Sequence, residues 1–267
     1  TGWAEDMSGY VIDLGIEPEE PDASFPLSGA RRTLASAAPP GAGTGGAVVA
    51  GLSRLLDRLL GVEWLREDGA VLRVERALID ANYGMMTDAV YEFIRSSPHA
   101  AVLTPSHGQF LPDRHWSRRQ QSRPGDRSGP GWRMPAASGR AVRHVVFDAN
   151  FWKTFVRARI GSTAGDPGKL TFCQLLPDRA RLLSEHLSSE YCVAANEQSR
   201  GVGEWRLRHK GRDNHWLDCI VGCAVGASTM GISLVGGPKA PATRRRISEM
   251  ARAARYGKKL DCGARGG

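Results

Sequence analysis

The sequence predicts an α/β protein built on a mixed sheet flanked by helices. Short apolar runs rich in β-branched residues alternate along the chain with segments whose apolar residues recur at helical spacing. The chain has 267 residues, enough to bury one sizeable core, and it contains no internal repeat and no convincing linker. We therefore expect one α/β domain over residues 1–235 that carries a basic loop insertion, followed by a basic C-terminal tail over residues 236–267.

The first sixty residues predict one strand and one long helix. Tyr10–Leu14 is a short apolar strand. Residues 18–46 are rich in proline, glycine and alanine and are expected to form a loop, with a short helix over 28–36. Ala47–Leu60 repeats leucine and valine every three or four residues, which predicts an amphipathic helix that ends at Gly61.

Residues 71–139 predict two strands, a helix and a long loop. Val71–Asp80 is apolar and β-branched, which favours a strand. Thr87–Arg95 begins with a capping threonine and is expected to be a helix, and Ala100–Thr104 a short buried strand. Pro112–Gly139 is rich in arginine, glycine and proline, so we expect an extended, mobile loop.

The last part of the chain continues this alternation. Its expected elements are a strand at Ala141–Phe147, helices at Phe151–Ile160 and Pro177–Glu190, a strand at Trp205–Arg208, a helix over 214–227 and a basic helix at Pro241–Tyr256. The helix over 214–227 is strongly apolar, and Cys219 and Cys223 on it are expected to be small core residues.

The positive charge of the chain is concentrated in two segments. The net charge is +8 and the pI about 9.6, and the excess lies between residues 113 and 143 and between residues 239 and 265. Basic segments of this kind are typical of proteins that bind nucleic-acid phosphates, which arginine contacts in a bidentate way. A solvated loop and tail are the alternative. The arginines expected to contact phosphates are Arg114, Arg118, Arg119, Arg123, Arg127 and Arg133.

Two aspartates stand in apolar surroundings. Asp80 ends the run that starts at Val71, and Asp218 lies near the start of the helix over 214–227. A carboxylate buried among apolar neighbours loses hydration and must be paired, protonated or bound to a cation. A strand end and a helix can together present the carboxylate oxygens that Mg²⁺ or Mn²⁺ prefers. For either aspartate by itself, a helix cap, a turn residue or an ion pair is the alternative.

Several common sites are absent from the sequence. The glycine-rich segment Gly41–Gly46 lacks the lysine of a phosphate-binding P-loop, which argues against an ATP-driven motor in this chain. No HExxH, GxSxG or Cys/His zinc spacing is present. The five cysteines form no CxxC pair, and no signal peptide or membrane-spanning run is found, so the expected location is a reducing cytoplasm.

Four motifs, in order, resemble the nuclease half of the GpA-type large subunit of phage terminase. Residues 78–84 and 87–93 (LIDANYG and TDAVYEF) are similar to the family pattern IDxGxxT..VY.F. Residues 147–155 (FDANFWKTF) are similar to its G.d..K segment, residues 187–190 (LSSE) to its QLTSE stretch, and residues 213–219 (DNHWLDC) to its closing LDC helix. The resemblance extends from Gly2 to about Ser233.

This resemblance implies an RNase H-like fold and metal-dependent hydrolysis of DNA. In that fold three acids hold two Mg²⁺ or Mn²⁺ ions, about 3.5–4 Å apart. Asp80 matches the second acid and Asp218 the third, both as catalytic metal ligands, and the strand with the first acid would precede Gly2. Asp148 and Glu190 are candidate outer ligands, although Asp148 could equally cap a helix and Glu190 could pair with an arginine.

The resemblance also implies partners. These are double-stranded DNA, a terminase small subunit and a portal protein, in the cytoplasm of the host cell and with no membrane. The family's upstream ATPase motor half is absent from this sequence. Two other functions stay open: a different RNase H-like enzyme, such as a transposase or junction resolvase, and a non-catalytic DNA-binding or packaging module that keeps the acids as structural caps.

Overall fold

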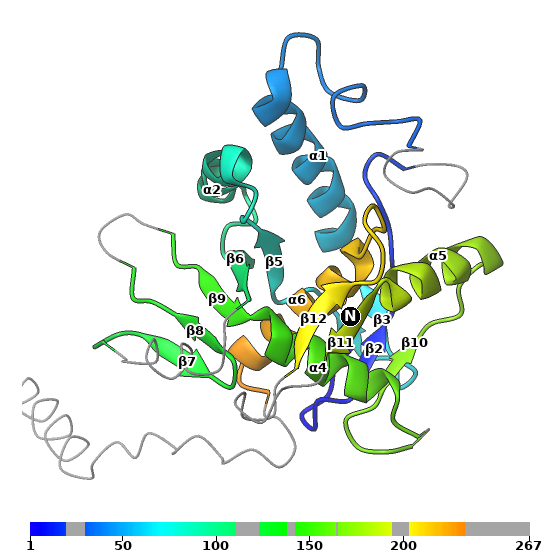
Figure 1. Cartoon of the computed structure of the whole chain (residues 1–267). Coiled ribbons are helices and arrows are strands. Elements are labelled where there is room, and N and C mark those ends of the chain that lie inside the picture. Colours follow the sequence, from blue (N-terminus) through cyan, green and yellow to red (C-terminus); the bar gives the residue numbers. More distant parts are fainter. Residues whose placement is uncertain (20–29, 111–122, 138–141, 164, 194–202, 233–267) are drawn as a thin grey trace, which may run out of the picture. The chain divides into compact units, whose positions relative to one another are not determined.

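A five-stranded mixed sheet forms the centre of the fold (Figure 1). The computed structural model describes residues 1–19, 30–110, 123–137, 142–163, 165–193 and 203–232. The strand order is β5-β6-β9-β8-β7, with the bounds Ala77–Asp80 (β5), Leu103–Gln109 (β6), Val145–Asp148 (β9), Trp132–Met134 (β8) and Arg127–Gly129 (β7). The predicted α/β class, a mixed sheet flanked by helices, is confirmed.

Three neighbouring strands of this sheet run parallel, and an antiparallel hairpin extends it. β6 pairs in parallel with β5 and β9, whereas β8 pairs antiparallel with β9, and β7 with β8. Asp80, the last residue of β5, lies opposite Ser106 of β6. Asp80 therefore stands at the carboxyl edge of the parallel strands, where open α/β sheets bind their ligands.

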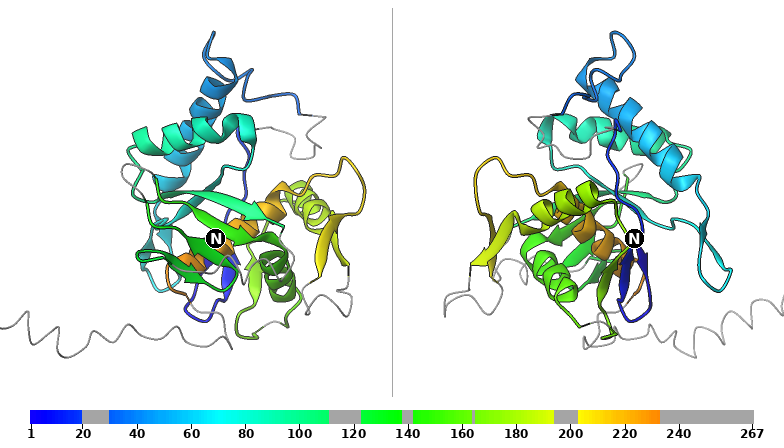
Figure 2. Two further views of the ribbon diagram at one scale, coloured as in Figure 1. Left: turned by 60° about the vertical axis from the view of Figure 1, so that its left-hand side comes forward. Right: turned by 90° about the vertical axis from the view of Figure 1, so that its right-hand side faces the viewer.

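Helices cover both faces of the central sheet. In the described part of the chain they are α1 (Gly43–Leu60), the 3₁₀ helix η2 (Gly84–Met86), α2 (Thr87–Ser96), α4 (Ala149–Ile160), α5 (Pro177–Ser188) and α6 (His215–Thr229). α1 and α2 lie together in both views of Figure 2 and share one core cluster, whereas α4 and α6 belong to a second, larger one. None of these helices has the length and apolar character needed to cross a bilayer.

The side chains of β5 divide between these two clusters. Ala77 and Ile79 pack with α1 and α2, whereas Leu78 packs in the cluster that contains α6. Side chains alternate along a strand, so Asp80 lies on the same face as Leu78. The sheet thus directs Asp80 toward the face that α6 covers.

Three small sheets complete the described fold. They are β1 (Gly2–Trp3) with β2 (Gly9–Val11) and β10 (Leu170–Phe172), β3 (Trp64–Leu65) with β4 (Val71–Leu72), and β11 (Glu190–Val193) with β12 (Glu204–Leu207). The β11–β12 hairpin is bound to α4, because Trp205 donates its backbone N–H to Asn150 Oδ1 (3.0 Å) and its indole N–H to Thr154 Oγ1 (2.9 Å). This contact brings Glu190, at the start of β11, to the side of α4.

Several predicted elements differ from the structure. The glycine-rich residues 43–46, expected as loop, form the first turn of α1. Val71–Asp80 is two separate strands, β4 and β5, which pair with different partners. Glu190 begins a strand instead of ending a helix. Residues 30–36 form no helix, and Pro241–Tyr256 lies outside the described residues.

The expectation of one extended loop over Pro112–Gly139 is wrong for its second half, which forms the β7–β8 hairpin. Trp132 anchors this hairpin: its side chain is buried, and its indole N–H donates to Ser228 Oγ over 2.8 Å. Burial of a tryptophan against a distant helix stabilises the hairpin in spite of a composition that favours loops.

Gly131, in the β7–β8 turn, provides a test of this packing. Its φ is +64°, and a Cβ placed there would lie 2.4 Å from Cδ1 of Phe151. An L-residue in the left-handed conformation costs about 1–2 kcal/mol. We expect Gly131→Ala to lower the free energy of unfolding by more than this, because the clash with Phe151 adds to the cost. Gly69→Ala is the matched control, with φ +84° and open space around the new Cβ. Denaturant titrations that gave equal losses for the two variants would contradict close packing of the turn on Phe151.

Candidate functional site

Asp218 lies in the first turn of α6 and is held by a lysine from α4. The ammonium nitrogen of Lys153 is 3.0 Å from Oδ1 of Asp218. The same nitrogen donates to both carboxylate oxygens of Glu190, over 2.7 and 2.8 Å. Asn214 donates its amide N–H to Oε1 of Glu190 over 2.6 Å. One ammonium therefore joins two acids that come from different elements of the fold.

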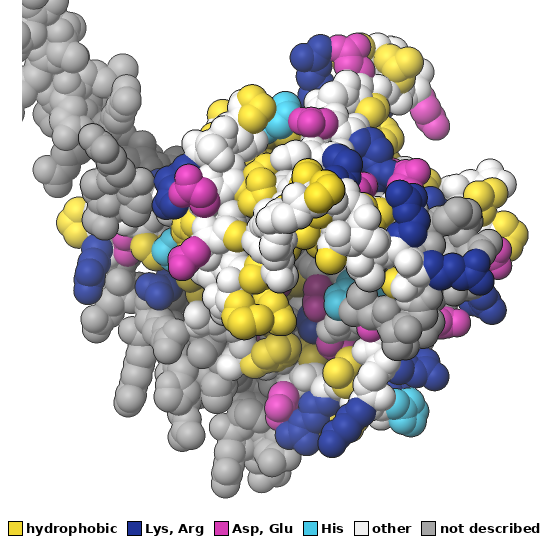
Figure 3. All heavy atoms as spheres, turned by 90° about the horizontal axis from the view of Figure 1, so that it is seen from above, with side chains coloured by type: hydrophobic (Ala, Val, Ile, Leu, Met, Phe, Trp, Pro, Cys, Tyr) yellow, Lys and Arg dark blue, Asp and Glu magenta, His cyan; other side chains and the backbone are white. Residues whose placement is uncertain are grey.

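The Lys153–Glu190 pair is buried, whereas Asp218 is open to solvent on one side. The side chains of Lys153 and Glu190 are each 4% exposed, and that of Asp218 is 49% exposed. Burial nevertheless raises the pKa of the Asp218 carboxyl, although the charge of Lys153 opposes the shift. Oδ1 of Asp218 faces the buried Lys153, and the rest of the side chain is open to solvent; the space in front of this open side is called the recess below. Figure 3 shows a hollow with acidic, basic and histidine side chains at its bottom.

Asp80 reaches the same region from the central sheet. α6 passes over β5, where Gly226 faces Leu78. Two residues before Leu78, Arg76 donates to Sδ of Met230, the residue that follows α6. From Arg76 to Asp80 the chain therefore runs along α6 from its end toward its start, where Asp218 lies. The two aspartates that the sequence singles out thus stand on two elements that pack together, β5 and α6.

The expectation that both aspartates are buried is wrong. Asp80 is exposed and Asp218 is half-exposed, and Cys219, expected in the core, is exposed as well. Their apolar neighbours, half-buried on β5 and buried on α6, point to other sides of the same strand or helix. Around Asp218 these buried neighbours are Trp216, Leu217, Ile220 and Val221.

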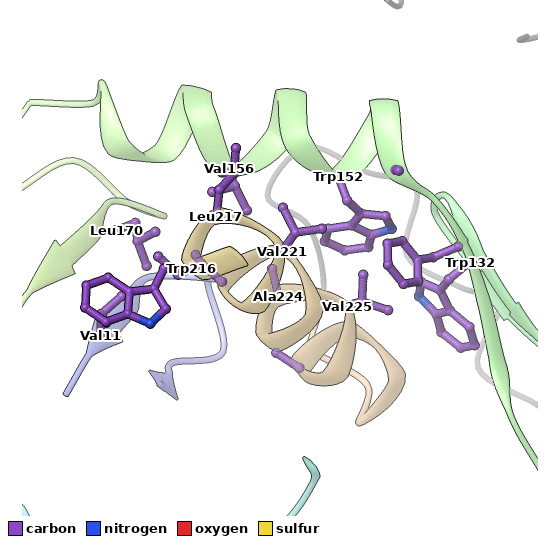
Figure 4. Packing of buried hydrophobic residues seen from close by; sticks show 14 of the residues in the cluster. Val11, Trp132, Trp152, Val156, Leu170, Trp216, Leu217, Val221, Ala224 and Val225 are labelled. Atoms are coloured by element: carbon purple, nitrogen blue, oxygen red, sulfur yellow. The ribbon is translucent and has the colours of Figure 1, made fainter. Parts of the chain in front are cut away.

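Helix α6 is fixed in the core by the sides that turn away from Asp218. Its buried side chains pack against Val11 and Leu170 from the small sheet and against Trp152 and Val156 from α4 (Figure 4). At its start the backbone N–H of Trp216 donates to His186 Nδ1 over 3.2 Å. Packing of this kind holds the Asp218 backbone in one position against the sheet.

A hydrogen-bond network from α2 and β6 fixes the chain after Asp80. Oδ1 of Asp80 accepts from the backbone N–H of Asn82 (3.0 Å), and the Asn82 amide donates to the Gly108 carbonyl (2.8 Å). The Asn82 amide oxygen faces His107 Nδ1 (3.2 Å), and His107 Nε2 faces the Tyr91 hydroxyl (2.9 Å). Because the Asn82 oxygen can only accept, the network assigns the His107 proton to Nδ1, and Nε2 accepts from Tyr91.

This assignment predicts how stability depends on pH. Burial lowers the pKa of His107, although the charge of Asp80 opposes the shift. A histidine with a lower pKa in the folded chain costs stability as the pH falls below its unfolded value of about 6.5. We expect the free energy of unfolding to fall between about pH 7.5 and about pH 5, and to fall less in His107→Gln. His209→Gln, at an exposed histidine, is the control. The free energy of unfolding is measured by denaturant titration at each pH, and the same pH dependence in all three proteins would contradict the expectation.

The two candidate outer ligands have other partners. Oδ1 of Asp148 accepts from the backbone N–H groups of Asn150 (2.9 Å) and Phe151 (3.3 Å), so this buried aspartate caps α4. Glu190 pairs with a lysine and not with an arginine. Sequence reasoning assigned no role to Lys153, although the segment FDANFWKTF that resembles the terminase motif contains it.

Of the six candidate phosphate-binding arginines, Arg123, Arg127 and Arg133 lie in the described residues, and Arg114, Arg118 and Arg119 lie outside them. Arg127 donates to the Thr229 carbonyl over 2.7 Å and thus binds the C-terminal end of α6. Backbone hydrogen bonds, and then the charges of Arg123 and Arg133, lower the pKa of Asp126. Contact of these arginines with phosphate stays a prediction.

Asp80 and Asp218 are the residues that could take part in binding a hard divalent cation. Asp80 and Asp218 offer carboxylate oxygens, and Mg²⁺ commonly binds one or two carboxylates together with water and substrate phosphates. The described residues contain no group of three or more His, Cys, Asp or Glu side chains that could hold a metal by itself. Oxygen atoms from water and from a phosphate would have to complete the coordination.

The comparison with known families covers nearly all of the described chain. The family described as "Terminase large subunit gpA, endonuclease domain" matches residues 1–239. No curated protein and no solved structure matches the chain. The family match spans β5, α4 and α6, the elements that carry Asp80, Lys153 and Asp218.

Proposed function

Because the chain belongs to the family of terminase large subunit gpA endonuclease domains, we propose that it hydrolyses phosphodiester bonds of double-stranded DNA with a divalent cation. One observation carries the assignment of the site. Asp218, in contact with the buried Lys153, and Asp80 are both open to solvent, and they stand on two elements that pack together, α6 and β5. The RNase H-like fold is part of the proposal. It is supported by the three parallel strands with an antiparallel hairpin, and by an acid-bearing helix across one face.

Asp80 and Asp218 are the proposed ligands of Mg²⁺ or Mn²⁺. When bound, such a cation supplies a water of lowered pKa and neutralises charge on the phosphate. Lys153 favours the ionised form of Asp218, which a cation requires. The backbone N–H of Asn82 orients the Asp80 carboxylate.

The arginine-rich segment is proposed to hold the DNA. Guanidinium groups on and beside the β7–β8 hairpin would contact backbone phosphates and position the duplex without reading its sequence. By family membership, the partners of this activity are those of DNA packaging, a terminase small subunit and a portal protein.

Plasmid cleavage by the purified chain tests the proposal. Supercoiled plasmid is incubated with the wild type, with Asp80→Ala/Asp218→Ala and with Asp57→Asn, each in Mg²⁺, Mn²⁺ or EDTA. We expect metal-dependent nicking by the wild type and by Asp57→Asn, which changes a surface aspartate whose side chain is 70% exposed. Nicking that survives in the double variant would overturn the assignment of the site.

A non-catalytic DNA-binding or packaging module is the second candidate. Two observations favour it. Asp80 accepts a hydrogen bond from the Asn82 backbone N–H, as an aspartate that caps a turn does. The described residues also contain no group of three or more His, Cys, Asp or Glu side chains that could hold a metal. This function predicts plasmid binding without nicking in any of the three conditions, and the same assay therefore separates the two candidates.

A further inference from the structure

We propose that Lys153 replaces one of the two cations expected at this site, so that the chain binds a single divalent ion between Asp80 and Asp218. This inference rests on the proposed nuclease function and specifies its metal requirement. It also differs from the expectation of two ions that follows from the sequence resemblance.

The contacts of the lysine are those of a bound cation. An ammonium group has three N–H donors, and Lys153 has three carboxylate oxygens within 3.0 Å. Two belong to Glu190 and one to Asp218. With the side chains of Lys153 and Glu190 each 4% exposed, the charge is held between the acids and away from solvent. The ammonium therefore occupies the place between Glu190 and Asp218 that a second metal ion would need.

The balance of charges at the site also indicates a single divalent ion. Asp80, Asp218 and Glu190 carry three negative charges and Lys153 one positive charge, and a single divalent ion neutralises the remainder. A second divalent ion on Glu190 would have to displace both Lys153 and the Asn214 amide from its oxygens. The displaced ammonium would stay buried without its counter-ion, which is strongly unfavourable.

Asp218 keeps an open side for the single ion. Lys153 contacts its Oδ1, the side chain is 49% exposed, and α6 packs against the strand that ends in Asp80. In this arrangement the positive charge of Lys153 between the two acids does not depend on the metal concentration. The metal ion is then needed at only one position.

Counting bound Mn²⁺ tests the inference. The electron paramagnetic resonance signal of free Mn²⁺ is titrated with the full chain, alone and with a short DNA duplex, and bound ions per chain are obtained from the lost signal. Wild type, Asp80→Asn, Lys153→Met and the surface control Asp57→Asn are compared. We expect one ion for wild type and for Asp57→Asn, and at least a tenfold weaker affinity for Asp80→Asn.

If Lys153→Met folds, its empty position is expected to take a second ion and raise the count to two. If it does not fold, the inference is tested by the number of ions that the wild type binds and by the affinity of Asp80→Asn for Mn²⁺. Two ions in the wild type would overturn the inference even if cleavage is confirmed, and so would a single ion that Asp80→Asn leaves unaffected. Failure of the proposed function shows separately, as an absence of metal-dependent nicking.

Discussion

Replacing Lys153 by methionine is expected to lower the free energy of unfolding by about 3–5 kcal/mol, the cost of leaving a buried charge without its partner. Lys153 and Glu190 are each 4% exposed, and both Glu190 oxygens accept from the ammonium. Methionine fills a similar volume but provides no charge and no N–H donor. Among the described residues, Glu190 would keep only the Asn214 amide as a partner, which cannot compensate for a buried carboxylate. Denaturant titration monitored by tryptophan fluorescence measures the loss.

Two further variants give this prediction a control. In Lys153→Met/Glu190→Gln the charge of both partners is gone, and we expect most of the lost stability to return. Arg95→Met breaks the exposed pair with Glu92, whose side chains are 48% and 69% exposed, and little or no change is expected. If the double variant is as unstable as Lys153→Met, the single variant loses stability because of altered packing and not because of an unpaired charge.

Replacing Asp218 by asparagine is expected to lower the rate of metal-dependent plasmid nicking by more than about a hundredfold. Loss of an outer-shell partner alone typically costs about 10–100-fold in metal affinity or activity, and Asp218 is proposed as a direct ligand. Asparagine keeps the size of the side chain and removes its charge. DNA affinity is expected to stay the same or to rise, because one negative charge disappears from a recess that receives a phosphate.

The stability of Asp218→Asn separates the catalytic role of Asp218 from a structural one. Its side chain is 49% exposed, and Lys153 keeps its contacts with Glu190, so we expect only a small change in the free energy of unfolding. Nicking rate, fluorescence anisotropy of a labelled duplex and denaturant titration are measured on the same preparation. A structural cap would show the opposite pattern, with lower stability and with nicking reduced only in proportion to the unfolded fraction.

Much of the fold could be predicted because its causes are local. Helix Ala47–Leu60 follows from apolar spacing, and helices α2, α4, α5 and α6 lie within a few residues of their predicted bounds. The Val71–Asp80 run could not be divided correctly from its composition. Its break depends on which strands are available to pair with each half. The β7–β8 hairpin was missed for a similar reason, since burial of Trp132 beside α6 stabilises it.

The sequence by itself determined the α/β class, the family and the choice of Asp80 and Asp218, because periodicity and motif order are written along the chain. Only the tertiary structure decided how these acids are used. It placed Lys153 between Glu190 and Asp218, made Asp148 a helix cap and left both candidate ligands open to solvent. Burial and ion pairing depend on elements that are distant in the sequence and meet only in the folded chain. The charges around a side chain and its exposure to solvent are therefore set by the folded structure and not by the local sequence.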